Sequence, residues 1–259
     1  MDISTLNLII GAISTILIIF SFLVSITSPQ SITDYDRERV EKESRSVPEA
    51  LRGIYNAVGN WLYWIVSKSK FLHNINPQSL SFMGLGLNLL GALFISAEII
   101  SLGAIFITGG GILDIIDGKV AREKRMAKKS GSLLDSVLDR IGEIAIFSSI
   151  CFFLMKKGEY TFSVITALAM GFSMLVSYVR AKAESFGLSP KEGIMRRQER
   201  VFIMAVSLLL DSIFQYITQK IIFLPFGIAV ILVGSFITSI IRFKKSYNEL
   251  EEIEKKIEK

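Results

Sequence analysis

The sequence has little of several residue types, and each scarcity excludes a class of protein. The single cysteine, Cys151, cannot form an internal disulfide, and its place in an apolar run favours a packing role. The single histidine, His73, excludes a zinc site built from histidines, and we expect its side chain to lie at the membrane edge. No glycine-rich segment has the form of a Walker A phosphate loop. No basic stripe interleaved with aromatic residues is present either, so nucleic acid is not an expected partner.

Apolar sequence is what the chain has in abundance. Of its 259 residues, 51% are hydrophobic, and they come in long runs between charged segments, which predicts an all-α, multi-pass membrane protein. The first run, residues 3–26, follows Asp2 rather than a basic start, so we expect an uncleaved membrane anchor helix. Six later runs reach or approach the roughly 20 residues that cross the hydrocarbon. They span residues 79–97, 99–121, 132–155, 160–184, 199–217 and 221–242.

Four segments follow from this pattern. Residues 1–28 form the anchor, and residues 29–73 form a charged linker followed by an amphipathic helix in the membrane interface. The linker, of mixed charge, is expected to be solvated or a short surface helix. The aromatic-rich part, residues 53–72, has an alternative interpretation as the capped end of the next span. A six-helix membrane domain at 74–243 and a charged tail at 244–259 complete the chain.

The basic residues predict the orientation. If the linker is cytoplasmic, alternation of the spans places 25 of the 29 basic residues on that side, as the positive-inside rule requires. We therefore expect a cell-membrane protein whose charged segments, and any site next to them, face the cytoplasm. The lysines and arginines between the second and third core spans are interpreted as general membrane-surface charge. They are Lys119, Lys124, Arg125, Lys128 and Lys129.

Two pairs of aspartates lie near that cytoplasmic edge. Asp114 and Asp117 are three residues apart and Asp135 and Asp139 are four apart, so each pair projects from one side of its helix. The short basic hairpin between the pairs is expected to make the two helices antiparallel neighbours. Four carboxylates facing one another in an apolar protein need neutralising charge, and one or two divalent cations with oxygen ligands would supply it. Carboxylate ligands favour Mg²⁺ or Mn²⁺.

The acids belong to a longer pattern, Asp114-x-x-Asp117-Gly118-x-x-Ala121-Arg122, then eight residues, then Gly131-x-x-x-Asp135-x-x-x-Asp139. This pattern resembles the complete signature of the CDP-alcohol phosphotransferase family, over about residues 74–242. The resemblance implies a six-helix core and transfer of a phosphatidyl-type group from a CDP-linked lipid to an acceptor hydroxyl, with release of CMP.

The resemblance also implies roles for individual residues. Asp114, Asp117 and Asp135 would bind two metal ions, and Asp139 would be the general base and share a metal. The donor lipid, CDP-diacylglycerol or CDP-archaeol, would contact seven residues: Asp114, Asp117, Gly118, Ala121, Arg122, Gly131 and Ser81. For Arg122, an ion pair with a motif aspartate is an equal alternative. Family members are usually homodimers, which makes a homodimer the expected assembly.

The first core span has its own signals. Asn76 suits a helix cap and Pro77 a first turn. The family usually has Pro-Asn followed by a hydroxyl residue here, whereas this chain has Gln78 and keeps the hydroxyl at Ser81. Three glycines in the span, Gly84, Gly86 and Gly91, are expected to allow close helix packing.

The acceptor is predicted from a basic hairpin after the fourth core span. The run Tyr178 to Glu184, with the later pair Glu199-Arg200, resembles the family branch that uses inositol phosphate. We expect L-myo-inositol 1-phosphate as the acceptor, with its phosphate bound by guanidinium and ammonium groups. The residues are Arg180, Lys182, Arg196 and Arg200. An ordinary positive-inside loop and a glycerol 3-phosphate acceptor remain alternatives.

Other functional classes fit the acids less well. A transporter would scatter them through the bilayer midplane, whereas here they gather at one membrane face. A membrane pyrophosphatase or lipid phosphatase shares the metals but has no need of an alcohol pocket.

Overall fold

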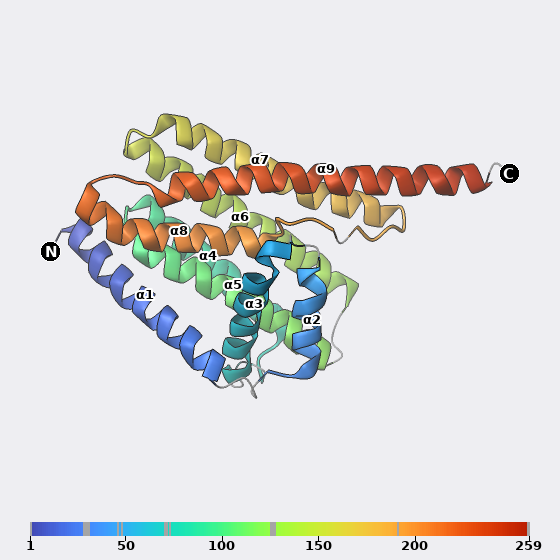
Figure 1. Ribbon diagram of the computed structural model, residues 1–259, viewed down its shortest axis with the longest axis horizontal. Coiled ribbons are helices and arrows are strands. Elements are labelled where there is room, and N and C mark those ends of the chain that lie inside the picture. The colour runs from blue at the N-terminus through green and yellow to red at the C-terminus, as the bar shows by residue number, and fades with distance from the viewer. Residues whose placement is uncertain are drawn as a thin grey trace.

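The computed structural model describes residues 2–27, 32–45, 47, 49–69, 72, 74–124, 128–190 and 192–257, and the elements in this part of the chain are helices (Figure 1). Two residues considered above, His73 and Arg125, lie outside the described residues. The helices are α1 (Ile3–Thr27), α2 (Asp34–Ser44), α3 (Glu49–Lys68), α4 (Pro77–Ser96), α5 (Ile100–Glu123), α6 (Lys129–Lys156), α7 (Tyr160–Ser185), α8 (Arg197–Thr218) and α9 (Phe223–Ile257).

Six of the described helices, α1, α4, α5, α7, α8 and α9, are long and apolar enough to cross a membrane. The protein is therefore an all-α, multi-pass membrane protein, as predicted. The helix expected at 132–155 is α6, and its 28 residues give it ample length. It differs from the other six because Asp135, Asp139, Arg140 and Glu143 make its first half polar.

The start of α4 confirms the expected cap. The Asn76 side chain accepts a hydrogen bond from the backbone N–H of Gln78 at 3.1 Å, and Pro77 occupies the first turn. Such a cap sets where α4 begins, and therefore which of its side chains face α5.

Glycines bring α4 and α5 together along their length. Positions for a Cβ at Gly84 and Gly91 would lie 3.5 Å from the Gly110 carbonyl oxygen and 3.1 Å from the Gly103 carbonyl oxygen. A Cβ on Gly110 would collide with the Asn88 side-chain amide. The packing role predicted for Gly84 and Gly91 is thus confirmed. For Gly86 the prediction is wrong, because no described atom lies within 4 Å of its Cβ position.

The helix α4 packs against both α5 and α6, whereas α5 and α6 make few backbone contacts with each other. The two aspartate-bearing helices, expected to be antiparallel neighbours, therefore meet through side chains at their ends and do not pack closely along their length. Instead, α8 packs along α5. The ends of α5 and α6 face each other across side chains, which leaves space for a polar site.

An apolar core fills the other half of the bundle. It joins α5, α6, α8 and α9 through side chains such as Ile107, Phe147, Leu208 and Ile231, all of which are fully buried. Cys151 also has the expected packing role, since its Sγ contacts the carbonyl oxygen of Ser163 on α7 at 3.4 Å. This core leaves the polar residues of α6 at one end of the molecule.

The anchor helix α1 packs on α8, α5 and α3. Its buried Asn7 donates to the carbonyl oxygen of Glu98 at 2.7 Å and accepts from the backbone N–H and hydroxyl of Ser101 at 3.1 and 2.9 Å. These bonds tie α1 to the turn between α4 and α5, and α1 is an integral part of the bundle.

The helices α2 and α3 pack together and run across the direction of α8 and α9 (Figure 1). One face of α2, formed by Asp36, Val40 and Ser44 at intervals of four residues, is buried. The linker is therefore a short surface helix, and the solvated role does not hold for that face. On α3, Trp61 is buried and donates to the Ser21 hydroxyl of α1 at 3.0 Å, which is an internal packing role.

The last helix, α9, is continuous for 35 residues. At 1.5 Å per residue it is about 52 Å long, well beyond the roughly 30 Å hydrocarbon core. The charged tail is thus the end of a membrane helix that projects from the body of the molecule (Figure 1).

Candidate active site

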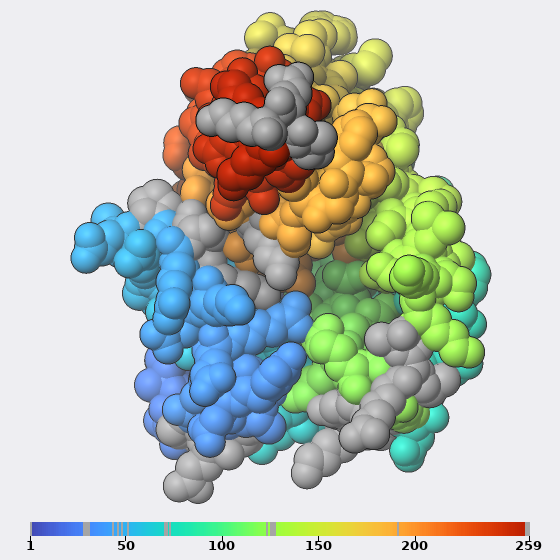
Figure 2. All heavy atoms as spheres, turned by 90° about the vertical axis from the view of Figure 1, so that its right-hand side faces the viewer, coloured from blue at the N-terminus to red at the C-terminus, as the bar shows by residue number. Residues whose placement is uncertain are grey.

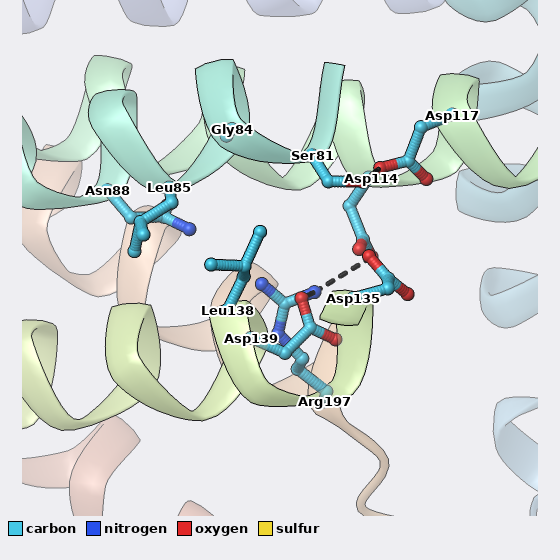
Figure 3. Close-up of a pocket in the computed structure, with 11 residues that line it drawn as sticks. Ser81, Gly84, Leu85, Asn88, Asp114, Asp117, Asp135, Leu138, Asp139 and Arg197 are labelled. Carbon is cyan, nitrogen blue, oxygen red and sulfur yellow. Dashed lines mark hydrogen bonds and ion pairs between the residues drawn. The ribbon is translucent and has the colours of Figure 1, made fainter. Parts of the chain in front are cut away.

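Three of the predicted acids converge where the ends of α5 and α6 face each other. Carboxylate oxygens of Asp114, Asp135 and Asp139 lie within 4.8 Å of one another, and all three side chains are half-buried. Asp114 lies on α5, and Asp135 and Asp139 lie on α6, after the basic hairpin that connects the two helices. Figure 3 shows the three carboxylates pointing toward one another.

Asp117 lies in the same cavity but is turned toward α4. Its Oδ2 accepts a hydrogen bond from the Ser81 hydroxyl at 2.7 Å, and the residue is only 5% exposed. Ser81 was expected to contact the donor lipid, and here it orients an aspartate. The site therefore has a cluster of three acids and a fourth acid one turn away.

An arginine side chain lies between the aspartates of α5 and α6. Nη1 of Arg197, at the start of α8, is 2.8 Å from Asp114 Oδ2 and 2.8 Å from Asp139 Oδ1 (Figure 3). The side chain of Arg197 is 12% exposed. Since it joins α5, α6 and α8, this arginine holds the two aspartate pairs at a defined separation.

The residue roles predicted from the sequence did not include Arg197. Six cations gather around the α7–α8 hairpin in sequence, and nothing in their spacing distinguishes the one that reaches the acids. The available signal was its place in the first turn of α8, facing the aspartate-bearing ends of α5 and α6.

A second ion pair joins α6 and α8, one helical turn further along each helix. Nε of Arg200 donates to Glu143 Oε1 at 2.6 Å, and both side chains are 1% exposed. Arg140 also pairs with Glu143. Two successive ion pairs therefore connect α6 with α8. Asp139 pairs with Arg197, and Glu143 pairs with Arg200. Arg200, predicted to bind the acceptor, is directed at Glu143 in this structure.

The remaining motif positions, Gly118, Ala121, Arg122 and Gly131, are not among the residues that line the cavity. The guanidinium of Arg122 lies over Gly118, 3.2 Å from its Cβ position. Among the described residues Arg122 makes no ion pair with the motif aspartates. A Cβ on Gly131 would have no described atom within 4 Å, so the space beside this residue is open. Ala121 is half-buried.

The other predicted acceptor residues lie on the same end of the molecule. Arg180 is exposed and pairs with Glu184 at 2.8 Å, while the Lys182 ammonium lies 4.8 Å from the centre of the Phe186 ring. Arg196 precedes the first residue of α8 and is half-buried.

A further arginine, Arg242 of α9, contacts α7 and the segment before α8, which carry Arg180 and Arg196. It is only 4% exposed, and its guanidinium donates to the carbonyl oxygens of Val176 at 3.0 Å and Glu192 at 2.8 Å. The sequence placed Arg242 at the end of a span, 42 residues after Arg200, and did not indicate that it makes these contacts.

Figure 2 looks onto this end of the molecule. The surface is hollowed between the blue atoms of α2 and α3 and the green atoms of α6, with the orange atoms before α8 above. The narrow cavity below is lined on α4 by one helix face. That face consists of Ser81, Gly84, Leu85 and Asn88.

The donor set fits a divalent cation. Three carboxylates from two helices, within 4.8 Å of one another, offer hard oxygen ligands on converging sides, and Asp117 adds a fourth nearby. The acids carry more negative charge than Arg197 neutralises, so the site has net charge to attract a cation.

Comparison with known proteins finds related sequences and folds. The family model described as CDP-alcohol phosphatidyltransferase matches residues 74–243. An uncharacterised protein of Aquifex aeolicus is 31% identical over 179 residues, covering 69% of this chain and 86% of that protein. An archaetidylinositol phosphate synthase of Pyrococcus horikoshii is 28% identical over 68% of this chain and 86% of its own length. A phosphatidylinositol phosphate synthase of Cutibacterium acnes is 38% identical, over 37% of this chain and 46% of its own.

Solved structures share the fold. The phosphatidylinositol phosphate synthase of Mycobacterium tuberculosis with CDP-DAG bound superposes with a TM-score of 0.61 at 23% identity, over 70% of this chain and 92% of that one. A structure of the same enzyme in complex with manganese and citrate also gives 0.61, over 71% and 87% of the two chains.

Proposed function

Because the chain belongs to the CDP-alcohol phosphatidyltransferase family, we propose that it transfers a phosphatidyl-type group from a CDP-linked lipid to L-myo-inositol 1-phosphate. An oxygen of the acceptor hydroxyl bonds to the β-phosphorus of the donor, the bond to the bridging oxygen breaks, and CMP leaves. The observation that carries the proposal is the convergence of Asp114, Asp135 and Asp139 beside Arg197 at the open end of α5 and α6.

The carboxylates would hold Mg²⁺ or Mn²⁺, and we propose two ions bound by Asp114, Asp117, Asp135 and Asp139. When bound, the ions neutralise the diphosphate and stabilise the charge on the departing CMP. The M. tuberculosis structure with manganese supports a metal of this class. Ser81 keeps the Asp117 carboxylate oriented toward α4.

Asp139 is proposed to accept the proton of the attacking hydroxyl. It is the acid of the cluster closest in sequence to the Glu143–Arg200 pair, and Arg197 fixes its carboxylate at 2.8 Å. A fixed, half-buried carboxylate is suited to general base catalysis if the hydroxyl lies within hydrogen-bond reach. Arg197 is thus a positioning residue for the proposed base.

The acceptor phosphate is proposed to bind at the arginines on α7, α8 and α9. Arg180, Lys182, Arg196 and Arg200 were predicted from sequence, and Arg242 contacts the helix and the segment that carry Arg180 and Arg196. Guanidinium groups bind phosphate through paired hydrogen bonds. Relatives named phosphatidylinositol phosphate synthase and archaetidylinositol phosphate synthase support inositol phosphate over the alternative, glycerol 3-phosphate.

The proposed setting is the cell membrane, with the site facing the cytoplasm and the donor reaching it from the bilayer. The recess in Figure 2 lies at the end where α9 and its charged tail project, as the positive-inside rule predicts for a cytoplasmic face. Both diacylglycerol and archaeol chains suit an apolar helix surface. A homodimer is proposed from the family resemblance.

Purified protein with CDP-diacylglycerol and Mn²⁺ would test the acceptor. CMP release is measured with inositol 1-phosphate, glycerol 3-phosphate, serine and free inositol, and separately with CDP-archaeol. We expect release with inositol 1-phosphate and none with serine or free inositol. Release with serine or free inositol would contradict the acceptor assignment and leave the family reaction intact.

A further inference from the structure

A buried ion pair links the N-terminal segment to the helix that carries the first two aspartates. Nζ of Lys119 on α5 is 2.7 Å from Asp36 Oδ2 on α2, and the two side chains are 10% and 4% exposed. The Thr33 hydroxyl donates to the same Oδ2 at 2.7 Å, and the Asp36 backbone N–H donates back to Thr33 at 3.2 Å. This reciprocal cap holds the Asp36 carboxylate in place. The interpretation of Lys119 as membrane-surface charge is therefore wrong.

The position of Lys119 makes this pair relevant to the site. It lies two residues after Asp117, and residues two apart on a helix do not share a face. Lys119 therefore points away from the aspartates, toward α2 and α3. Besides its packing on α4 and α8, α5 is therefore contacted beyond Asp117 from the α2 side, through Lys119. Ile115 packs there too, against the cluster that contains Val40 and Tyr63.

The partner helix of α2 makes a similar contact with α8. The Tyr55 hydroxyl of α3 donates to Glu199 Oε1 at 3.1 Å, and Glu199 lies two residues after Arg197. The α2–α3 pair thus contacts both α5 and α8. These are the helices whose Asp114 and Arg197 meet at 2.8 Å inside the site.

A buried ion pair is a poor source of stability, because removing both charges from water costs about as much as their attraction returns. The retained pair is better explained by the geometry that it imposes. We propose that Asp36 is a positioning residue: through Lys119 it sets the place of α5, and with it Asp114 and Asp117, relative to α8. Asp36 lies outside residues 74–243, so this device belongs to the N-terminal segment and not to the matched family domain.

The test compares single and double neutral variants. Asp36→Asn and Lys119→Met each leave one buried charge unpaired, so we expect both to lower the melting temperature in detergent. The double variant D36N/K119M leaves no unpaired charge and should recover that temperature. If the ion pair positions α5, the double variant should still show kcat lowered at least fivefold and a half-activating Mn²⁺ concentration raised at least fivefold. Lys119→Arg keeps the pair and should stay within twofold of the wild type in both.

A substrate-free readout separates this inference, which rests on the proposed function, from that function itself. The rise in melting temperature on Mn²⁺ addition is measured without lipid, and its midpoint should shift at least fivefold in the double variant. Glu98→Gln, which removes an ion pair with Lys156 and Lys157 at the opposite end of the bundle, should leave the midpoint unchanged. A double variant with wild-type kcat and wild-type Mn²⁺ midpoint would overturn the inference. A wild type that releases no CMP would instead refute the proposed reaction, while the midpoint still tests the positioning.

Discussion

Asp139 is the side chain on which the proposed proton transfer depends. Its carboxylate is fixed by Arg197 at 2.8 Å and lies within the group formed with Asp114 and Asp135. An amide in its place keeps the shape and loses the ability to take a proton. The other acids keep their positions, so metal binding and catalysis can be separated.

We expect Asp139→Asn to lower kcat at least about 100-fold, which is the lower range for loss of a general base. The Mn²⁺-dependent rise in melting temperature should persist, with a midpoint no higher than that of Asp135→Asn, because three carboxylate ligands remain. The KM for CDP-diacylglycerol should change little. Rates of CMP release and thermal unfolding in detergent are the measurements. An Asn variant that turns over normally would show that Asp139 is not the base.

Individual residues show where prediction from sequence reaches its limit. The aspartates were predicted because helical spacing fixes which side chains share a face, and three of the four do converge. Arg197 and Asp36 were not, since their partners are distant in sequence. Arg197 meets Asp114 across 83 residues, and Asp36 meets Lys119 across the same separation. Charge patterns along a chain do not indicate which distant opposite charges will meet.

Close contact between α4 and α5 places Ser81 and Asp117 within hydrogen-bond distance. Gly110 is central to it, because a Cβ there would meet the Asn88 amide and lie 3.0 Å from the Gly84 carbonyl oxygen.

Gly110→Ala should therefore lower the free energy of unfolding by about 1–3 kcal/mol, the usual cost of overpacking. Gly86→Ala is a matched control in α4, since no described atom lies within 4 Å of its Cβ position. Thermal unfolding of both variants in the same detergent is the measurement. Equal melting temperatures for the two would contradict the packing described here.

The start of α9 is capped by a side chain from α8. Asp211 is fully buried, and its carboxylate accepts from the backbone N–H groups of Ile222 at 2.9 Å, Phe223 at 3.0 Å and Leu224 at 2.6 Å. These are the first donors of the helix, which have no partner within it.

Asp211→Ala removes the acceptor of three backbone donors, one of them, Leu224, buried, so we expect it to lower the free energy of unfolding by about 2–3 kcal/mol. Asp211→Asn keeps one carbonyl acceptor and should lose less. The ratio of kcat to KM measured below the melting temperature should stay near that of the wild type, because the cap lies at the opposite end from the aspartates. An Ala variant as stable as the wild type would exclude the capping role.

Helices were easier to predict than their neighbours. Apolar length located the membrane helices, and Asn76 and Pro77 marked the start of α4. The packing of α6 on α4 rather than α5 was not predicted, because a short connection indicates proximity but not which helix fills the space between. The change in composition predicted a boundary between the last span and the charged tail. In the structure both belong to one continuous helix, α9, because the tail residues also favour helix.

The two ends of the molecule differ in the number of basic residues that they carry, and the proposed orientation can be measured directly. In a background lacking Cys151, a cysteine at Glu252 on α9 should react with a membrane-impermeant maleimide only from the cytoplasmic side. A cysteine at Lys220, between α8 and α9, should react only from the opposite side. Both are exposed in the structure. Reversed labelling would place the aspartates on the outer face and contradict the proposed location.

The central claim is that the aspartates between α5 and α6 act through bound divalent cations. Release of CMP from CDP-diacylglycerol with inositol 1-phosphate, followed while a chelator is titrated in and Mn²⁺ is then restored, tests it most directly. We predict that activity falls to background when the chelator exceeds the metal and returns on addition of Mn²⁺ or Mg²⁺. Asp135→Asn should need more metal for the same recovery, because it removes one carboxylate ligand. Full activity in excess chelator would contradict the claim.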